Sequence, residues 1–61
     1  MLYPFDLSMV KNGSKTIWIA KSVSLKGCVG QGDTSREAIR ELEENERVWI
    51  SVAKEERIPI L

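Results

Sequence analysis

The apolar residues of this chain change their spacing about halfway along it. From Tyr3 to Met9 they alternate with polar residues, which is typical of a strand with one buried face. From Ala38 onward they recur at intervals of three and four residues, which is typical of an amphipathic helix. A switch of this kind favours the α+β class, in which a sheet and a helix pack as two layers around one core.

The first half of the chain predicts a three-stranded antiparallel meander. The pair Asn12-Gly13 predicts a tight hairpin turn between the first two strands, because both residues tolerate positive φ. The second strand is apolar on both faces, so we expect it to be central or to meet another subunit. The third strand is the weakest, since a glycine interrupts it. The expected strands are Tyr3–Met9, Thr16–Ala20 and Val23–Val29.

One long helix is expected to cover this sheet. Thr34 and Glu37 have the spacing of a capping box, in which each side chain binds the backbone amide of the other residue, and Asp33 adds negative charge near the helix start. A helix of about 20 residues is long enough to cover three strands. Pro59 marks its latest end, and 57–61 is expected to be an extended tail. The expected buried stripe is Ala38, Ile39, Leu42, Trp49, Val52 and Ala53, interrupted by Asn45 and Glu46.

The small size of the chain predicts self-association. Its 61 residues make a single domain (1–61) with a marginal core. Disulfides, metals or oligomers usually support such a core. One cysteine excludes an intramolecular disulfide, and the absence of histidine argues against structural zinc. Of the three kinds of support, self-association is the one that the sequence leaves open.

The sequence also indicates a cytoplasmic protein. It has a lone cysteine, no apolar run of membrane length and no signal-peptide pattern.

The charges are balanced in number and uneven in position. Nine basic and nine acidic side chains give a net charge of zero, which argues against nucleic-acid binding by bulk electrostatics. Lysines outnumber acids in the first 26 residues, and glutamates dominate the remainder. This distribution favours a solvated helix face and lysines that protect strand edges, with a dipolar binding surface as the alternative.

Several residues have a structural and a chemical interpretation, and the structural one is favoured in each case. The glycines before the helix fit positive φ or close backbone approach, with a phosphate cradle as the alternative. Cys28 fits a small buried side chain better than a nucleophile, since no histidine is present to activate it. Trp18 and Trp49 fit core or interface anchors better than platforms for bases.

The segment 25–34 resembles the signature of the HicB-type antitoxins. It reads Leu-Lys-Gly-Cys-Val-Gly-Gln-Gly-Asp-Thr, and a Glu-Ala pair follows at the family's spacing. Tyr3-Pro4 resembles the opening of the family's first strand. Ile58-Pro59 resembles the family's ending, where the chain returns as a further strand, which implies a short fourth strand at the C-terminal end of these residues. Lys26 stands where proline is usual, and 55–57 lacks the glycine that often stops the helix. The motif residues are Gly27, Cys28, Gly32, Asp33, Thr34, Glu37 and Ala38.

The resemblance implies a partial ribonuclease-H-like fold without enzymatic activity. Nucleases of that fold hold two metal ions with several carboxylates. Here the strands offer only Asp6, which is expected to point away from the core, so we expect no catalytic residue, metal, cofactor or small-molecule substrate.

The implied partner is a HicA-type toxin, a small basic ribonuclease that cleaves mRNA. An acidic helix face would complement it and would improve the association rate and specificity more than the affinity. A homodimer or a dimer of dimers is also expected. The candidate toxin-binding residues, chosen by charge alone, are Glu41, Glu43, Glu44, Glu46 and Glu55.

Two further interpretations stay open. Many HicB proteins carry a second, DNA-binding domain, which these residues do not include, so no nucleic-acid binding is expected from this domain alone. The chain is then a short form or the N-terminal part of a transcriptional autoregulator. Members without a neighbouring toxin also exist, so an orphan interaction or oligomerisation module is the alternative to an antitoxin.

Overall fold

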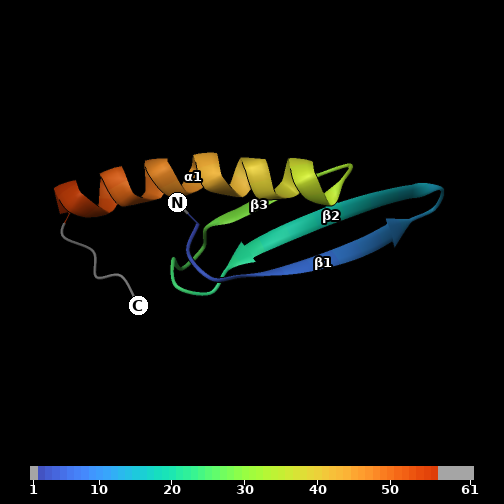
Figure 1. The fold of residues 1–61 in the computed structure, drawn as a ribbon, viewed down its shortest axis with the longest axis horizontal. Helices are drawn as coiled ribbons and strands as arrows, with labels where there is room; N and C mark the ends of the chain where they lie inside the picture. The colour runs from blue at the N-terminus through green and yellow to red at the C-terminus, as the bar shows by residue number, and fades with distance from the viewer. Residues whose placement is uncertain (1, 57–61) are drawn as a thin grey trace.

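The computed structural model describes residues 2–56, which form a three-stranded antiparallel sheet covered by one helix (Figure 1). The strand order is β1-β2-β3, so the second strand is central. This is the α+β meander that the sequence predicts, while the expected fourth strand lies outside the described residues. The elements are β1 (Phe5–Asn12), β2 (Lys15–Ser22), β3 (Val29–Gly32) and α1 (Ser35–Glu56).

The first two strands form a hairpin that is longer than its alternation suggests. Asn12 pairs with Lys15, so the two-residue loop consists of Gly13 and Ser14. Gly13 supplies the positive φ, at 67°. The turn is therefore displaced by one residue from the predicted Asn12-Gly13, because Asn12 stays in the ladder, where it pairs with Lys15.

The third strand was predicted in the wrong place. Residues 23–27 form a compact loop, and Gly27 turns the chain with a φ of 80°. The Ser22 amide donates to the Cys28 carbonyl at 3.0 Å, and the Ser22 hydroxyl accepts from the Leu25 amide at 3.0 Å. Leu25 is fully buried inside this loop. The loop thus satisfies its own backbone groups, and β3 begins only at Val29, where the predicted strand was expected to end.

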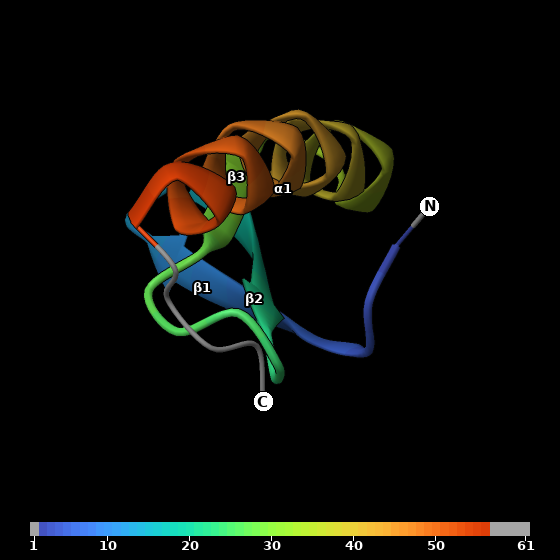
Figure 2. The same ribbon diagram turned by 90° about the vertical axis from the view of Figure 1, so that its left-hand side faces the viewer.

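Two glycines let the helix lie directly on β3. A Cβ atom at Gly30 would stand 2.5 Å from the Ala38 carbonyl oxygen, and one at Gly32 would stand 2.5 Å from the Cβ of Glu37. Viewed from the end in Figure 2, α1 lies above β3. The interpretation that glycines before the helix permit close backbone approach is confirmed for Gly30 and Gly32, and both residues lie in β3.

The core lies between α1 and the upper faces of β2 and β3. Its buried members come from β2, from α1 and from the segment that leads into β3. Half-buried aromatic residues, including both tryptophans, pack around it as the sequence predicts. Val52, by contrast, is 42% exposed, so the predicted buried stripe is narrower than its pattern. The buried cluster is Ala20, Leu25, Cys28, Ala38 and Leu42.

The helix begins at a capping box. The Thr34 hydroxyl accepts a hydrogen bond from the Glu37 amide at 3.1 Å, as predicted. The Glu37 carboxylate returns to the Asp33 amide at 3.1 Å, one residue earlier than the expected Thr34 amide. Both bonds satisfy backbone amides at the start of the helix, which is 22 residues long in total.

Replacing Thr34 with alanine is expected to lower the free energy of unfolding by about 1 kcal/mol, because the Glu37 amide loses its acceptor. Urea unfolding followed by far-UV circular dichroism measures this change. Thr34→Ser keeps the hydroxyl and is the matched control. Equal stability of the alanine and serine variants would contradict the role of the cap.

Candidate partner-binding surface

One flank of α1 runs along the outer edge of β3, and we call it the β3 flank. The Asn45 side-chain amide donates to the Val29 carbonyl at 2.7 Å. One turn earlier, the Glu41 carboxylate accepts from the Gln31 amide at 3.3 Å. These are the backbone groups that an added strand would otherwise use, so the helix blocks this edge against strand pairing.

A surface hollow of about 450 Å³ opens beside this edge. Val48 is 63% exposed at its rim, which is unusual for an apolar side chain on a helix that also has a buried face. The Trp49 indole forms one wall, and its N–H donates to the Lys26 carbonyl at 2.9 Å, which fixes the ring. We call this hollow the valine pocket; its lining residues are Gly27, Cys28, Val29, Asn45, Val48, Trp49 and Val52.

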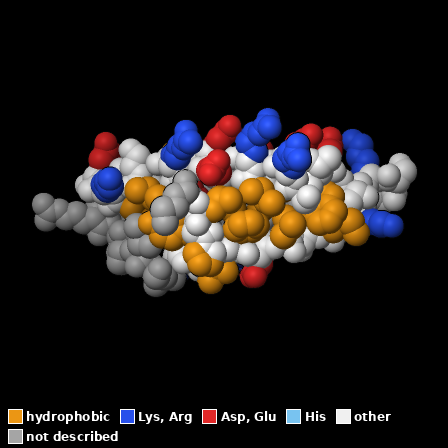
Figure 3. Space-filling view, viewed as in Figure 1, with side chains coloured by type: hydrophobic (Ala, Val, Ile, Leu, Met, Phe, Trp, Pro, Cys, Tyr) orange, Lys and Arg blue, Asp and Glu red, His pale blue; other side chains and the backbone are white. Residues whose placement is uncertain are grey.

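The charges of the helix are sorted around its axis. At 3.6 residues per turn, exposed glutamates share the side of Val48, next to the valine pocket. The basic residues fall on the adjoining, outward side, among the charges visible along the helix in Figure 3. On this side of the helix, Glu44 lies one turn before Val48 and Glu55 lies two turns after it, and we call these two residues the acidic border of the valine pocket. The glutamates on its side are Glu37, Glu41, Glu44 and Glu55, and the basic residues are Arg36, Arg40, Arg47 and Lys54.

The five candidate toxin-binding glutamates do not form one surface. Glu41, Glu44 and Glu55 lie on the β3 flank. Glu43 is half-buried and lies on the other side of the helix. Glu46 is only 2% exposed, so its selection as a surface contact was wrong. Charge alone could not separate these residues, because their positions around the helix decide which of them meet solvent.

Glu46 instead holds the N-terminal segment against the helix. One carboxylate oxygen accepts from the Tyr3 amide at 3.1 Å. The other oxygen is buried without a hydrogen-bond partner among the described residues. A signal for this arrangement was present in the sequence, since Glu46 interrupts the apolar stripe at a core-facing position.

Cys28 is a free thiol that forms part of the core and the floor of the valine pocket. The prediction of a small buried side chain is confirmed, since it is 4% exposed. Burial raises the pKa of the Cys28 thiol above its ordinary value of 9.0, and the negative charge of Glu46 raises this pKa further. Both effects keep the thiol protonated and weakly reactive at neutral pH.

The raised pKa of Cys28 predicts a loss of stability in alkali. The unfolded chain releases this proton near pH 9.0 and the folded chain at higher pH. The stabilisation is therefore complete below pH 9.0 and is lost as the pH rises through the folded pKa. We expect wild type to lose more stability than Cys28→Ala as urea unfolding is repeated from neutral pH to well above pH 9.0. Parallel pH profiles of the two proteins would contradict this.

The remaining motif residues have structural roles. Gly27 turns the loop, Gly32 makes room for the helix, and Ala38 lies in the core. Asp33, Thr34 and Glu37 form the helix cap already described. Only Gly27 and Cys28 among them also line the valine pocket.

Other kinds of site find little support in the described part of the chain. Within residues 2–56, no three histidine, cysteine, aspartate or glutamate side chains gather where a metal ion would bind. No helix in the same range has the length and apolar character needed to span a membrane. Comparisons with family models, with curated proteins and with solved structures found no match for this chain.

Proposed function

We propose that this chain is an antitoxin domain of the HicB type, which binds and neutralises a HicA-type ribonuclease. The observation that carries the proposal is the valine pocket with its acidic border on the β3 flank. The resemblance of residues 25–34 and of Glu37-Ala38 to the HicB signature supplies the identity of the partner.

The surface suits a basic protein that presents an apolar side chain. Glu44 and Glu55 would attract positive charge during the encounter, because neither contributes to the core. Val48 and Val52, with the fixed indole of Trp49 behind them, would then bury an apolar anchor. An RNA-binding toxin has such a basic surface, and covering it would prevent access of mRNA.

The proposal assigns the chain no chemistry of its own. Asp6 is exposed and lies opposite Lys21 on the face of the sheet that points away from the helix, so it is remote from the helix glutamates. Neutralisation then works by steric and electrostatic masking, without a cofactor or a metal.

An orphan interaction module is the second candidate function. It is favoured by the exposed apolar residues of β1, among them Met9, which is 48% exposed.

Co-expression tests the antitoxin function directly. The adjacent small reading frame is expressed alone and together with this chain, and growth and co-purification are followed. We expect growth arrest by the neighbour alone and relief by the full chain. A harmless neighbour, or a toxic one that this chain neither binds nor relieves, would refute the proposal.

A matched pair of variants tests whether the valine pocket is the contact. Val48→Ser changes a 63% exposed valine at the pocket, and Val23→Ser changes a 57% exposed valine in the 23–27 loop. We expect Val48→Ser to weaken toxin binding about tenfold and Val23→Ser to leave it unchanged. Equal affinities for the two variants in isothermal titration would place the contact elsewhere.

A further inference from the structure

The outer edge of β1 presents backbone hydrogen-bonding groups to its surroundings. The Pro4 carbonyl accepts from the Val23 amide at 2.9 Å, on the same register that pairs β1 with β2. Alternate residues of an antiparallel strand direct their backbone groups to the same neighbour. The backbone groups of the even-numbered residues of β1 therefore face β2, and those of the odd-numbered residues point outward. The residues with outward backbone groups are Phe5, Leu7, Met9 and Lys11.

This edge differs from the opposite edge of the sheet. The helix blocks β3 through Asn45 and Glu41, as described above. Among residues 2–56, no comparable side-chain bond covers β1, which is the longer of the two edge strands at eight residues. Long, apolar, uncovered edges pair with other strands, and this one carries only Asp6 and Lys11 as charges.

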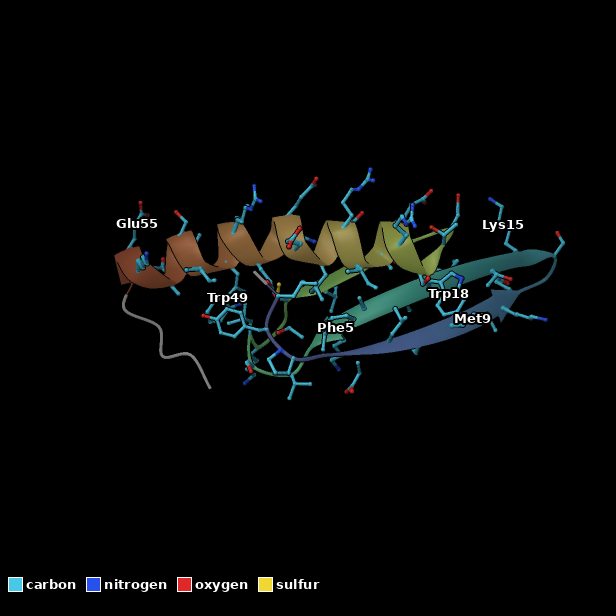
Figure 4. The ribbon with its side chains drawn as sticks, viewed as in Figure 1. Phe5, Met9, Lys15, Trp18, Trp49 and Glu55 are labelled. Carbon is cyan, nitrogen blue, oxygen red and sulfur yellow. The ribbon has the colours of Figure 1, made fainter. Side chains whose placement is uncertain are left out.

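The apolar side chains beside the edge are also uncovered. Leu7 is 41% exposed and Met9 is 48% exposed, although both project to the helix side of the sheet, where Ala20 is fully buried. They are exposed because α1 lies over β3 and β2. Figure 3 shows hydrophobic side chains in a band along this face of the molecule. In Figure 4, Phe5, Trp18 and Met9 lie below the helix on this same side.

We propose that β1 pairs with β1 of a second copy of this chain, antiparallel about a two-fold axis beside Ser8. This gives a continuous sheet of strand order β3-β2-β1-β1-β2-β3, with both helices on one face. The proposal concerns self-association and stands apart from toxin binding, since the β3 flank lies at the far edge of each sheet.

The sequence of β1 is self-complementary in this register. When two copies of a strand pair about a two-fold axis perpendicular to the sheet, one residue lies opposite its own copy. Here that residue is Ser8, and its neighbours Leu7 and Met9 then lie opposite each other. The outward backbone groups then meet each other, and the exposed Leu7 and Met9 side chains pack across the axis.

No like charges meet in this register. Asp6 lies opposite Val10, and Lys11 lies opposite Phe5. A stable dimer usually needs more buried area than strand pairing alone provides. In this register the exposed Leu7 and Met9 side chains add apolar area on the helix side of the sheet.

A cysteine at the axis provides the sharpest test. In a Cys28→Ala background, Ser8→Cys brings two thiols opposite each other at about 4.5 Å between Cα atoms, a separation that suits a disulfide. Asp6→Cys is the control on the same face, with its two copies roughly 14 Å apart. Mild oxidation is expected to cross-link the Ser8→Cys protein at least tenfold faster than the Asp6→Cys protein. Equal rates would overturn the proposed register.

Sedimentation of the full chain at high micromolar concentration provides the second test. For the wild type we expect a species of about twice 6.9 kDa. For Met9→Pro we expect a monomer whose circular dichroism spectrum is unchanged. The Met9 amide points outward, so its loss spares the hairpin. A 6.9 kDa wild type would overturn the proposal. The proposal would also be overturned if the full chain were monomeric and dimerised only after removal of residues 57–61. That result would mean that residues 57–61 occupy the outer edge of β1.

Discussion

Replacing Gly30 with alanine is expected to unfold the domain. The new methyl group would stand 2.5 Å from the Ala38 carbonyl oxygen and 2.8 Å from the Cα of Leu42. Both are backbone atoms of the helix, so no side chain can rotate to make room. Separating α1 from β3 would open the core, at a cost of about 3 kcal/mol or more. A domain of this size has a total stability of only about 3–5 kcal/mol.

Urea unfolding followed by circular dichroism measures this effect, with Gly13→Ala as the control. A Cβ atom at Gly13 would meet nothing within 4 Å among the described residues, so alanine there experiences only the strain of a positive φ. That strain is about 1–2 kcal/mol. A Gly30→Ala protein that is as stable as Gly13→Ala would show that the helix does not rest on β3 as described.

Reversing the charge of Glu44 is expected to slow association with the proposed toxin about tenfold at low salt. Glu44 is exposed on the β3 flank and, within residues 2–56, makes no bond to the sheet of the kind that Glu41 makes. The change therefore acts through the field outside the protein. A basic partner approaching the valine pocket would meet a positive charge where a negative one stood. Adding Glu55→Lys is expected to enlarge the effect.

Stopped-flow or surface-plasmon-resonance kinetics at low and high salt separate steering from damage to the fold. Salt screens exposed charges, so the difference between Glu44→Lys and wild type should largely disappear at high salt. Asp6→Lys makes the same change of charge on the far face of the sheet and is the matched control. Equal slowing by both variants would indicate an effect of net charge without a defined acidic site.

The fold was predictable where a local sequence pattern is typical of a single kind of structure. The alternation of β1 and the capping residues Thr34 and Glu37 identified a sheet followed by a helix. The placement of β3 was not predictable, because Gly30 and Gly32 fit a turn equally well. Their use depends on how closely α1 approaches, which is a tertiary contact that local sequence does not contain.

The candidate site was predictable only in part, for a related reason. Counting glutamates located the acidic helix, and helical spacing already set Glu46 apart from its neighbours. The valine pocket was missed, since Val48 interrupts an otherwise charged face and the spacing of Val52 fits a core position. Which valines are covered depends on the position of the sheet edge, and that position follows from the unexpected course of the 23–27 loop.

The bond between Tyr3 and Glu46 joins positions 43 residues apart. The chain must close a large loop, at a cost in conformational entropy, before this contact contributes stability. During synthesis the residues around Tyr3 leave the ribosome before Glu46, which anchors them. The β1–β2 hairpin can form early, but the core stays incomplete until Ala38 and Leu42 of α1 have also left the ribosome. A nascent chain that stalls before residue 46 would therefore leave the Tyr3 amide without its acceptor, and the N-terminal segment would be open to chaperones and proteases.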